Sequence, residues 1–424
     1  MHRKLALTAL LAGLCLGART ARAGNDEGIL IGGQAALTGG AVTAITGDGA
    51  AAWYNPAGLA RVHEHTLDLN ASVYGISVLT AKGLFTLPDG SASNASVVDW
   101  QLIPSALSYT RVLAPRWVGS FGVFIPSTTD VDLRSSVTLR DGTRWSYGAD
   151  QVRNQYDYIA SVGLRVSDTL RVGFALHGIY VSQESMGQVA TGMLGGAGPF
   201  VVASEHEVRS EYGLGCGLGV QWTVRPELEL GLAVQTPNLV GFRTVRRDVA
   251  TGGFGADATR RFGSEHVDRL TKPWAFGTPF VVRAGAAYTL GTIRLLADAT
   301  ISSPLDAAGR SLDRRLNGNA RVGVLVTPSA RLSYGAGLFS DRNGFRSADA
   351  SFLGVAGGVR LATHYVVREG ERHLTFATTL AGRYAYGWGE TEAVSFVAGT
   401  EFARSRADLS MHELAFNLGG AVTF

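Results

Sequence analysis

The chain has 424 residues, a formal net charge of +3 and 17% charged residues, against a usual charged share of ~25%. A charge this small and this dispersed argues against a nucleic-acid-binding protein. Past the first residues, no segment carries the ~18 uninterrupted apolar residues that a membrane-spanning helix needs. The 55 glycines are about twice the usual ~7% share, which is typical of an all-β protein outside the cytoplasm.

Residues 1–23 have the pattern of a secretory signal peptide. A positive start at Arg3 and Lys4 precedes an apolar run, and a small-x-small ending closes at Ala23, where we expect cleavage. Cys15 follows a leucine rather than a small residue, which argues against a lipid anchor. The exported chain then keeps only Cys216, so it has no internal disulfide.

Residues 24–64 differ from the rest of the chain because they lack alternating apolar and polar positions and are rich in Gly and Ala. Within GDGAAAWYNPAGLA, Asp48 can cap a short helix that ends near Tyr54, and Asn55 caps a second helix with Pro56 at its first position. Two short helices that meet at a sharp corner are compact. We expect this segment to plug the interior of a barrel.

From about Leu67 onward, apolar residues recur at every second position, the period of a strand with two different faces. The pattern predicts fourteen strands, which begin near residues 66, 98, 117, 151, 169, 206, 227, 277, 291, 317, 330, 350, 371 and 411. Short and long connections alternate, as they do in outer-membrane barrels whose termini are periplasmic. In a closed barrel every strand has two neighbours, so all backbone N–H and C=O groups within the hydrocarbon are paired. We therefore assign residues 65–424 to an all-β, antiparallel transmembrane barrel.

Aromatic residues beside the expected turns and loops predict the two girdles of such a barrel. They are Tyr109, Trp117, Trp222, Tyr288, Tyr334 and Phe424 on the turn side, and Tyr180, Tyr384, Tyr386 and Trp388 on the loop side. The alternative is a secreted β-sandwich. Its strands usually have ~5–6 residues, whereas the segments 206–224 and 373–388 exceed the ~9–11 residues that cross a bilayer.

Glycines at every second position shape the expected interior. In YGLGCGLGV (212–220) no helix follows the glycines, so we interpret the run as a strand and not as a nucleotide-binding loop. Bare inward positions predict an interior that is roomy or closely approached by other backbone. The other inward glycines are Gly163, Gly173, Gly231, Gly285, Gly323, Gly335, Gly337 and Gly419.

The expected third strand, 117–127, contains Gly119, Gly122 and Pro126. The glycines weaken a ladder and the proline cannot donate to one, which favours a kink or bulge, although ordinary barrel strands also contain glycine.

Two sets of residues are candidates for ligand contact. The fourth long connection, about 237–276, carries Phe242, Phe254, Phe262, Trp274 and Phe276, which form either a landing groove for a hydrophobic ligand or the loop's own small core. Inward arginines, including Arg283 and Arg321, either solvate a wet lumen or bind a carboxylate head group.

Catalysis and metal binding find little support. The chain has no GxSxG elbow and no HExxH helix. His63 and His65 share a face, but no third ligand is marked, so we interpret them as solvated histidines. We expect no enzymatic activity, no cofactor and no metal.

The run GGAVTAITGDGAAAWYNPAGLA (39–60), with its corner Asn55-Pro56-Ala57-Gly58, resembles the N-terminal signature of the FadL/TodX outer-membrane transporters of long-chain fatty acids and hydrocarbons. The fourteen expected strands and the terminal Phe424 support the resemblance, which is otherwise architectural. It implies that residues 24–64 are a hatch inside the barrel, and that an inward kink in the third strand opens a lateral route to the membrane. The chain lacks recognisable ligand-contact residues of the family, so the substrate stays open.

These patterns predict passive uptake of a hydrophobic compound at the outer membrane of a Gram-negative bacterium. The ligand is captured at the loops 185–205 and 237–276, enters the lumen, shifts the hatch and leaves through the wall. Expected partners are the ligand, outer-membrane lipids and the barrel-assembly machinery, which would recognise Phe424; we expect a monomer that binds no nucleic acid. The alternatives are a plugged structural or adhesive barrel without cargo and a barrel hydrolase, the latter disfavoured by the missing nucleophile motif.

Overall fold

A computed structural model describes residues 29–86, 91–138, 142–193, 200–254, 260–305, 314–342, 349–367, 372–398 and 401–424. The predicted signal peptide lies outside these residues. The elements are the helices α2 (Gly33–Thr38) and α3 (Ala51–Tyr54), the 3-10 helix η1 (Pro56–Arg61), and the strands β1 (Thr66–Thr86), β2 (Ala92–Ala114), β3 (Trp117–Phe124), β4 (Thr128–Thr138), β5 (Thr143–Arg165), β6 (Leu170–Met193), β7 (Phe200–Arg225), β8 (Leu228–Gln235), β9 (Leu239–Phe254), β10 (Arg260–Phe276), β11 (Val281–Leu290), β12 (Ile293–Ser302), β13 (Asn317–Ser329), β14 (Leu332–Asp341), β15 (Asp349–Val367), β16 (Arg372–Ala398) and β17 (Glu401–Thr423).

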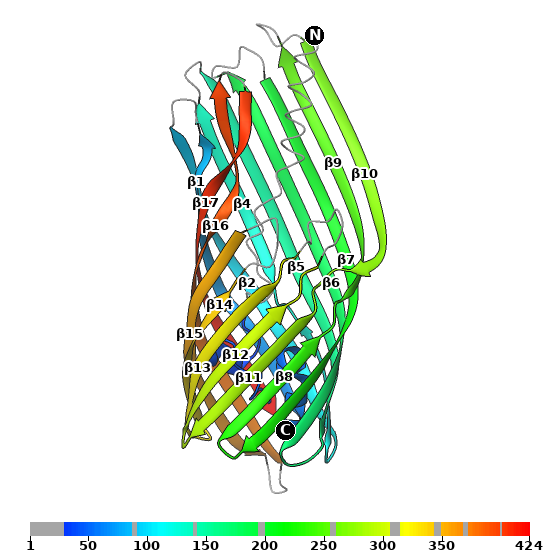
Figure 1. The fold of residues 1–424 in the computed structure, drawn as a ribbon, viewed down its shortest axis with the longest axis vertical. Helices are drawn as coiled ribbons and strands as arrows, with labels where there is room; N and C mark the ends of the chain where they lie inside the picture. The colour runs from blue at the N-terminus through cyan, green and yellow to red at the C-terminus, as the bar shows by residue number, and fades with distance from the viewer. Residues whose placement is uncertain are drawn as a thin grey trace.

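The strands form one closed antiparallel wall. β1 pairs with β17 from Thr66 opposite Thr423 to Lys82 opposite Asp408, so the last strand closes on the first. Three wall strands are each split in two, as β3/β4, β8/β9 and β10/β11, and the described residues therefore form a barrel of 14 wall strands, as the sequence predicts. Figure 1 shows short turns at the end near the C-terminus and long hairpins at the other end.

Each split wall strand contains a proline at its interruption, namely Pro126, Pro237 and Pro279. Proline has no N–H and cannot donate to a ladder, so interruptions at these positions follow from the sequence. The first interruption lies in the third wall strand, where the sequence predicts a kink or bulge.

Apolar side chains cover the outer surface, as the alternation predicts. The predicted girdle residues on the turn side and Tyr384, Tyr386 and Trp388 on the loop side are each 40 to 49% exposed. Tyr180 stands between two other tyrosines, with ring centres 6.2 Å from Tyr156 and 5.2 Å from Tyr212. Exposed aromatic rings thus face outward near both ends of the wall.

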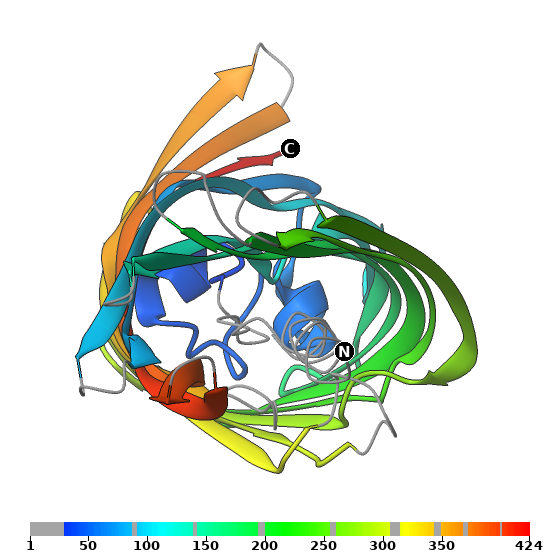
Figure 2. The same cartoon turned by 90° about the horizontal axis from the view of Figure 1, so that it is seen from above.

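The described part of the hatch lies inside the wall (Figure 2). It supplies buried residues such as Ile31, which precedes α2, Leu37 of α2 and Leu59 of η1, each at most 1% exposed. None of the helices in the described ranges is both long and apolar enough to cross a membrane.

The segments expected to be loops at 185–205 and 237–276 are instead mostly strand. The first belongs largely to β6 and β7, and the second to β9 and β10. Residues 263–271 of β10 are all exposed, so polar side chains occupy both faces and the alternation that marks a strand is lost. The long connections are therefore hairpins that extend the wall.

Candidate functional site

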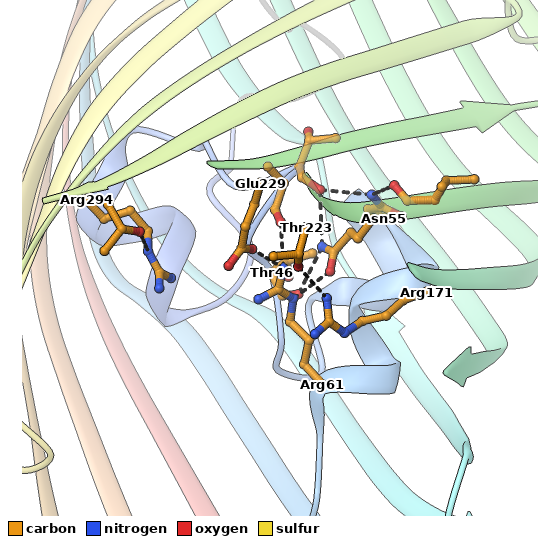
Figure 3. Close-up of polar contacts among 12 residues, drawn as sticks. Thr46, Asn55, Arg61, Arg171, Thr223, Glu229 and Arg294 are labelled. Carbon is orange, nitrogen blue, oxygen red and sulfur yellow. Dashed lines mark hydrogen bonds and ion pairs between the residues drawn. The ribbon is translucent and has the colours of Figure 1, made fainter. Parts of the chain in front are cut away.

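The corner of the hatch is held by one buried side chain, Asn55. Its oxygen accepts the N–H of Ala57 at 3.2 Å and caps η1, which begins at Pro56, as the sequence predicts. Its NH2 group donates to the carbonyl of Thr43 at 2.9 Å and to that of Val220 on β7 at 3.0 Å (Figure 3). Asn55 therefore ties both halves of the hatch to the barrel wall.

Inward glycines make room for the hatch backbone. A Cβ added at Gly173 or Gly219 would overlap the Asn55–Pro56 corner. At Gly163 it would lie 2.7 Å from the backbone nitrogen of Ala60, below the 3.0 Å that real Cβ atoms keep. The glycines predict either a roomy interior or one that other backbone approaches closely. At these positions the hatch backbone approaches closely.

Charged groups add further ties between wall and hatch. Arg61 of η1 forms an ion pair with Glu229 of β8 (Figure 3). Asp298 of β12 accepts the N–H groups of Val42 and Thr43 at 2.9 and 2.8 Å. An ion pair inside the barrel is stronger than a neutral hydrogen bond. β11 alone lies between β8 and β12 in the wall, so both ties hold the hatch on the same side.

The two arginines predicted as ligand contacts lie against the hatch. Arg283 is 4% exposed and its guanidinium carbon lies 5.9 Å from the ring centre of Trp53. Arg321 is 5% exposed and packs beside Gly40. Trp53 also packs against His177 of β6, with ring centres 6.4 Å apart.

An apolar stripe lines the inner wall above the hatch, and the sequence reasoning missed it. Its members are at most 6% exposed and belong to the same continuous apolar cluster as Trp53 and Tyr54. We call the following residues the apolar stripe: Leu79, Phe339, Phe352, Leu409 and Met411. The signal was present, because Phe339 continues the inward positions of Gly335 and Gly337 on one strand.

The third wall strand is broken at residues 125–127. Gly119 and Gly122 of β3 stay paired with β2, and this ladder ends at Phe124. From Phe124 to Thr128 the chain advances four positions, while the facing residues on β5 advance three, from Asp157 to Asn154. The break is therefore a bulge with one extra residue, and beyond it β4 forms a ladder only with β5 among the described strands.

A cavity of about 210 Å³ separates the hatch from the wall beside this break. Phe124, the last residue before the break, lines it together with Ile31 and Ala50 of the hatch. Asn70 also faces the cavity, with both side-chain polar atoms buried and without a hydrogen-bond partner. The hatch, the cavity and the break in the wall are thus neighbours.

The apolar residues predicted at 237–276 do not gather in one described groove. Trp274 and Phe276 lie on β10, 53% and 58% exposed. The side chains of Phe242, Phe254 and Phe262 lie outside the described part of the structure.

The two histidines at the entrance to β1 have other partners. His63 lies 3.2 Å from the guanidinium of Arg165, and His65 accepts the N–H of Val112 at 3.2 Å. In the described part of the chain, no three His, Cys, Asp or Glu side chains come together as a metal site would require.

Several solved structures share this architecture. A Pseudomonas aeruginosa FadL homologue is 14% identical, with 94% of this chain and 99% of that chain covered and a TM-score of 0.58. The P. putida toluene transporter TodX is 13% identical over 94% and 99%, with a TM-score of 0.60. The CymD monoaromatic hydrocarbon channel is 14% identical over 93% and 97%, with a TM-score of 0.57.

No protein-family model matches the sequence, and no curated protein matches it. At these identities the likeness to the solved structures is one of fold. It confirms the FadL/TodX fold that the motif at 39–60 predicts.

Proposed function

We propose that the protein is an outer-membrane channel for the passive uptake of hydrophobic compounds such as hydrocarbons or long-chain fatty acids. The compound is captured at the long hairpins, held in the lumen above the hatch and released sideways through the break at 125–127. The observation that carries the proposal is the continuous apolar cluster that runs from the upper wall to the hatch beside this break. The fold, shared with channels whose names specify toluene and monoaromatic hydrocarbons, supports the same class of cargo.

The apolar stripe supplies the binding energy. The guanidinium carbon of Arg383 lies 4.8 Å from the ring centre of Phe339, and a small hydrocarbon that displaces it to reach the stripe gains about 0.8 kcal/mol per buried methylene. No covalent step is needed, and the ligand moves down its own gradient.

Lateral release follows from the bulge. An apolar ligand gains nothing from an aqueous exit, whereas the break at 125–127, level with Asp157 to Asn154 on β5, interrupts the ladder at the edge of the membrane. A small shift of the hatch around Trp53 and Tyr54 would open the neighbouring cavity to the lumen, so the hatch need not leave the barrel.

Deleting Pro126 tests the exit. The deletion removes the one extra residue, so Phe124 and Thr128 resume continuous alternation and β4 can pair with β2. We expect uptake of radiolabelled toluene and oleate into proteoliposomes to fall at least about tenfold, while binding to the detergent-solubilised protein is kept. The matched variant Pro126→Ala keeps the extra residue and should keep most of the uptake.

Equal uptake by the deletion variant and the wild type would refute lateral release. A wild-type protein that binds neither compound saturably would instead support a plugged structural or adhesive barrel. Outer-membrane fractionation and size-exclusion chromatography would test the proposed location and the monomeric state, and removal of Phe424 would test recognition by the assembly machinery.

A further inference from the structure

A polar groove lies on the outside of the wall at its long-hairpin end. It has a volume of about 600 Å³ and is lined from β2, β4, β5 and β6. Arg134, Gly148 and Gln188 stand opposite one another across three of these strands, and side chains at opposed positions share a face. Trp145 of β5 is buried inside the barrel. Side chains alternate between the two faces of a strand, so Arg144, Ser146, Gly148 and Asp150 face outward.

The row of stacked tyrosines below the groove marks a change in the outer surface. Tyr156, Tyr180 and Tyr212 are in register on β5, β6 and β7. Below the row the outer face is apolar, with Leu176 and Leu214 at least 50% exposed. Above it lie polar contacts such as that of Glu184 with His206, at 2.8 Å. Because tyrosines gather at membrane boundaries, the row marks the upper edge of the hydrocarbon under the proposed outer-membrane placement.

The height of the groove excludes phospholipid head groups as its occupants. Asp150 and Arg144 lie six and twelve residues beyond Tyr156 on β5. At about 3.3 Å per residue and a tilt of about 40°, they stand about 15 and 30 Å above the row. Phospholipid head groups extend only about 5–8 Å beyond the hydrocarbon on each side. A lipid can fill the groove only if its head group is a long saccharide.

The lining suits a sugar that carries phosphate. Arg134 is 79% exposed and pairs with Asp132 at 2.9 Å, and Arg144 donates to Ser136 at 3.2 Å, so both guanidinium groups stand in the groove. Arginine binds phosphate in a bidentate manner, while the serine hydroxyls and carboxylates can bond sugar hydroxyls.

We propose that this groove binds the phosphorylated oligosaccharide of an outer-leaflet glycolipid, which lies against the wall above the break at 125–127. The inference depends on the outer-membrane placement, and not on which cargo the channel carries. It gives the outer wall a fixed lipid neighbour at the place where β2 and β4 are not joined by a ladder.

A steric variant tests the groove. A Cβ at Gly148 meets nothing within 4 Å, so Gly148→Trp can fill the groove without disturbing the wall. The control is Gly187→Trp, at a position that is equally open and paired with Ala149, the next residue on β5, but on the inner face. With purified lipopolysaccharide that has a complete core, native mass spectrometry should show about a tenfold loss of affinity for Gly148→Trp and less than about a twofold change for the control.

A charge variant provides an independent test. Arg134→Ala should weaken lipopolysaccharide binding by about tenfold, whereas Arg406→Ala, which removes an equally exposed arginine (77%) paired with Glu390, should not. Lipopolysaccharide with a truncated core and phosphatidylglycerol should bind wild type and variants alike. Equal losses for both arginine variants, or full binding by Gly148→Trp, would overturn the proposal. Toluene uptake by Gly148→Trp separates this result from a failure of the channel function.

Discussion

Adding a single methyl group at Gly163 should loosen the hatch while leaving the barrel closed. The Cβ of Gly163→Ala would lie 2.7 Å from the backbone nitrogen of Ala60 and 2.9 Å from the Cβ of Leu59. Ordinary contact begins at 3.4 Å, so η1 must retreat by about 0.7 Å. Overpacking of this kind costs about 1–3 kcal/mol, and each 1.4 kcal/mol is tenfold in an equilibrium. The undocked hatch should therefore become about 5- to 150-fold more populated.

Hydrogen exchange in detergent micelles measures this population directly. The N–H groups of Val42 and Thr43 bond to Asp298 of the wall at 2.9 and 2.8 Å, so they lose their acceptor when the hatch undocks and report that opening. The control Gly187→Ala adds the same methyl to an inward glycine with nothing within 4 Å and should exchange as the wild type does. If the two variants exchange at the same rate, the inward glycines do not seat the hatch, and our account of them is wrong.

Three further changes test the site. Asp298→Ala removes the acceptor of two hatch N–H groups, each costing about 1–3 kcal/mol when left unpaired, so exchange at those amides should rise at least about tenfold. Phe352→Ala should weaken toluene binding, measured by calorimetric titration, about tenfold because it removes apolar lining. Leu353 is 57% exposed on the outer face, so Leu353→Ala should bind toluene as the wild type does. Burial raises the pKa of Asp48, and the charge of Arg360 opposes the shift only in part. The contribution of Asp48 to hatch docking should therefore be largest at pH below about 4, the ordinary aspartate value, and be lost as the pH rises through the raised value, a trend that the difference in exchange between the wild type and Asp48→Asn would show.

Local chemistry made the hatch corner and the wall predictable. Asn55 before Pro56 predicts a cap, because proline favours extended backbone in the residue before it and a short polar side chain there can accept an N–H of the helix. Alternation specified the wall, since each strand has one apolar face. The glycines indicated close approach, although they did not show which backbone approaches.

Contacts between distant segments were beyond the sequence. Arg283 and Arg321 were correctly expected to point inward, but nothing local shows that the hatch covers them. The β9–β10 hairpin was mistaken for a loop because water surrounds both of its faces. Phe339 and Phe352 escaped notice because ligand contacts were sought among the loops, although the parity of the neighbouring glycines already placed Phe339 inside.

The chemistry of proline explains how the wall can carry an extra residue. An unpaired backbone group inside a membrane costs several kcal/mol, so an extra residue in a strand is normally unfavourable. Here the N–H of Ile125 still bonds Ser105 at 2.9 Å, and the carbonyl of Ser127 still accepts from Gln155 at 3.1 Å. Pro126, between them, has no N–H to leave unpaired. The extra residue therefore interrupts the wall at little cost in hydrogen bonds, at the level where the hatch would deliver a ligand.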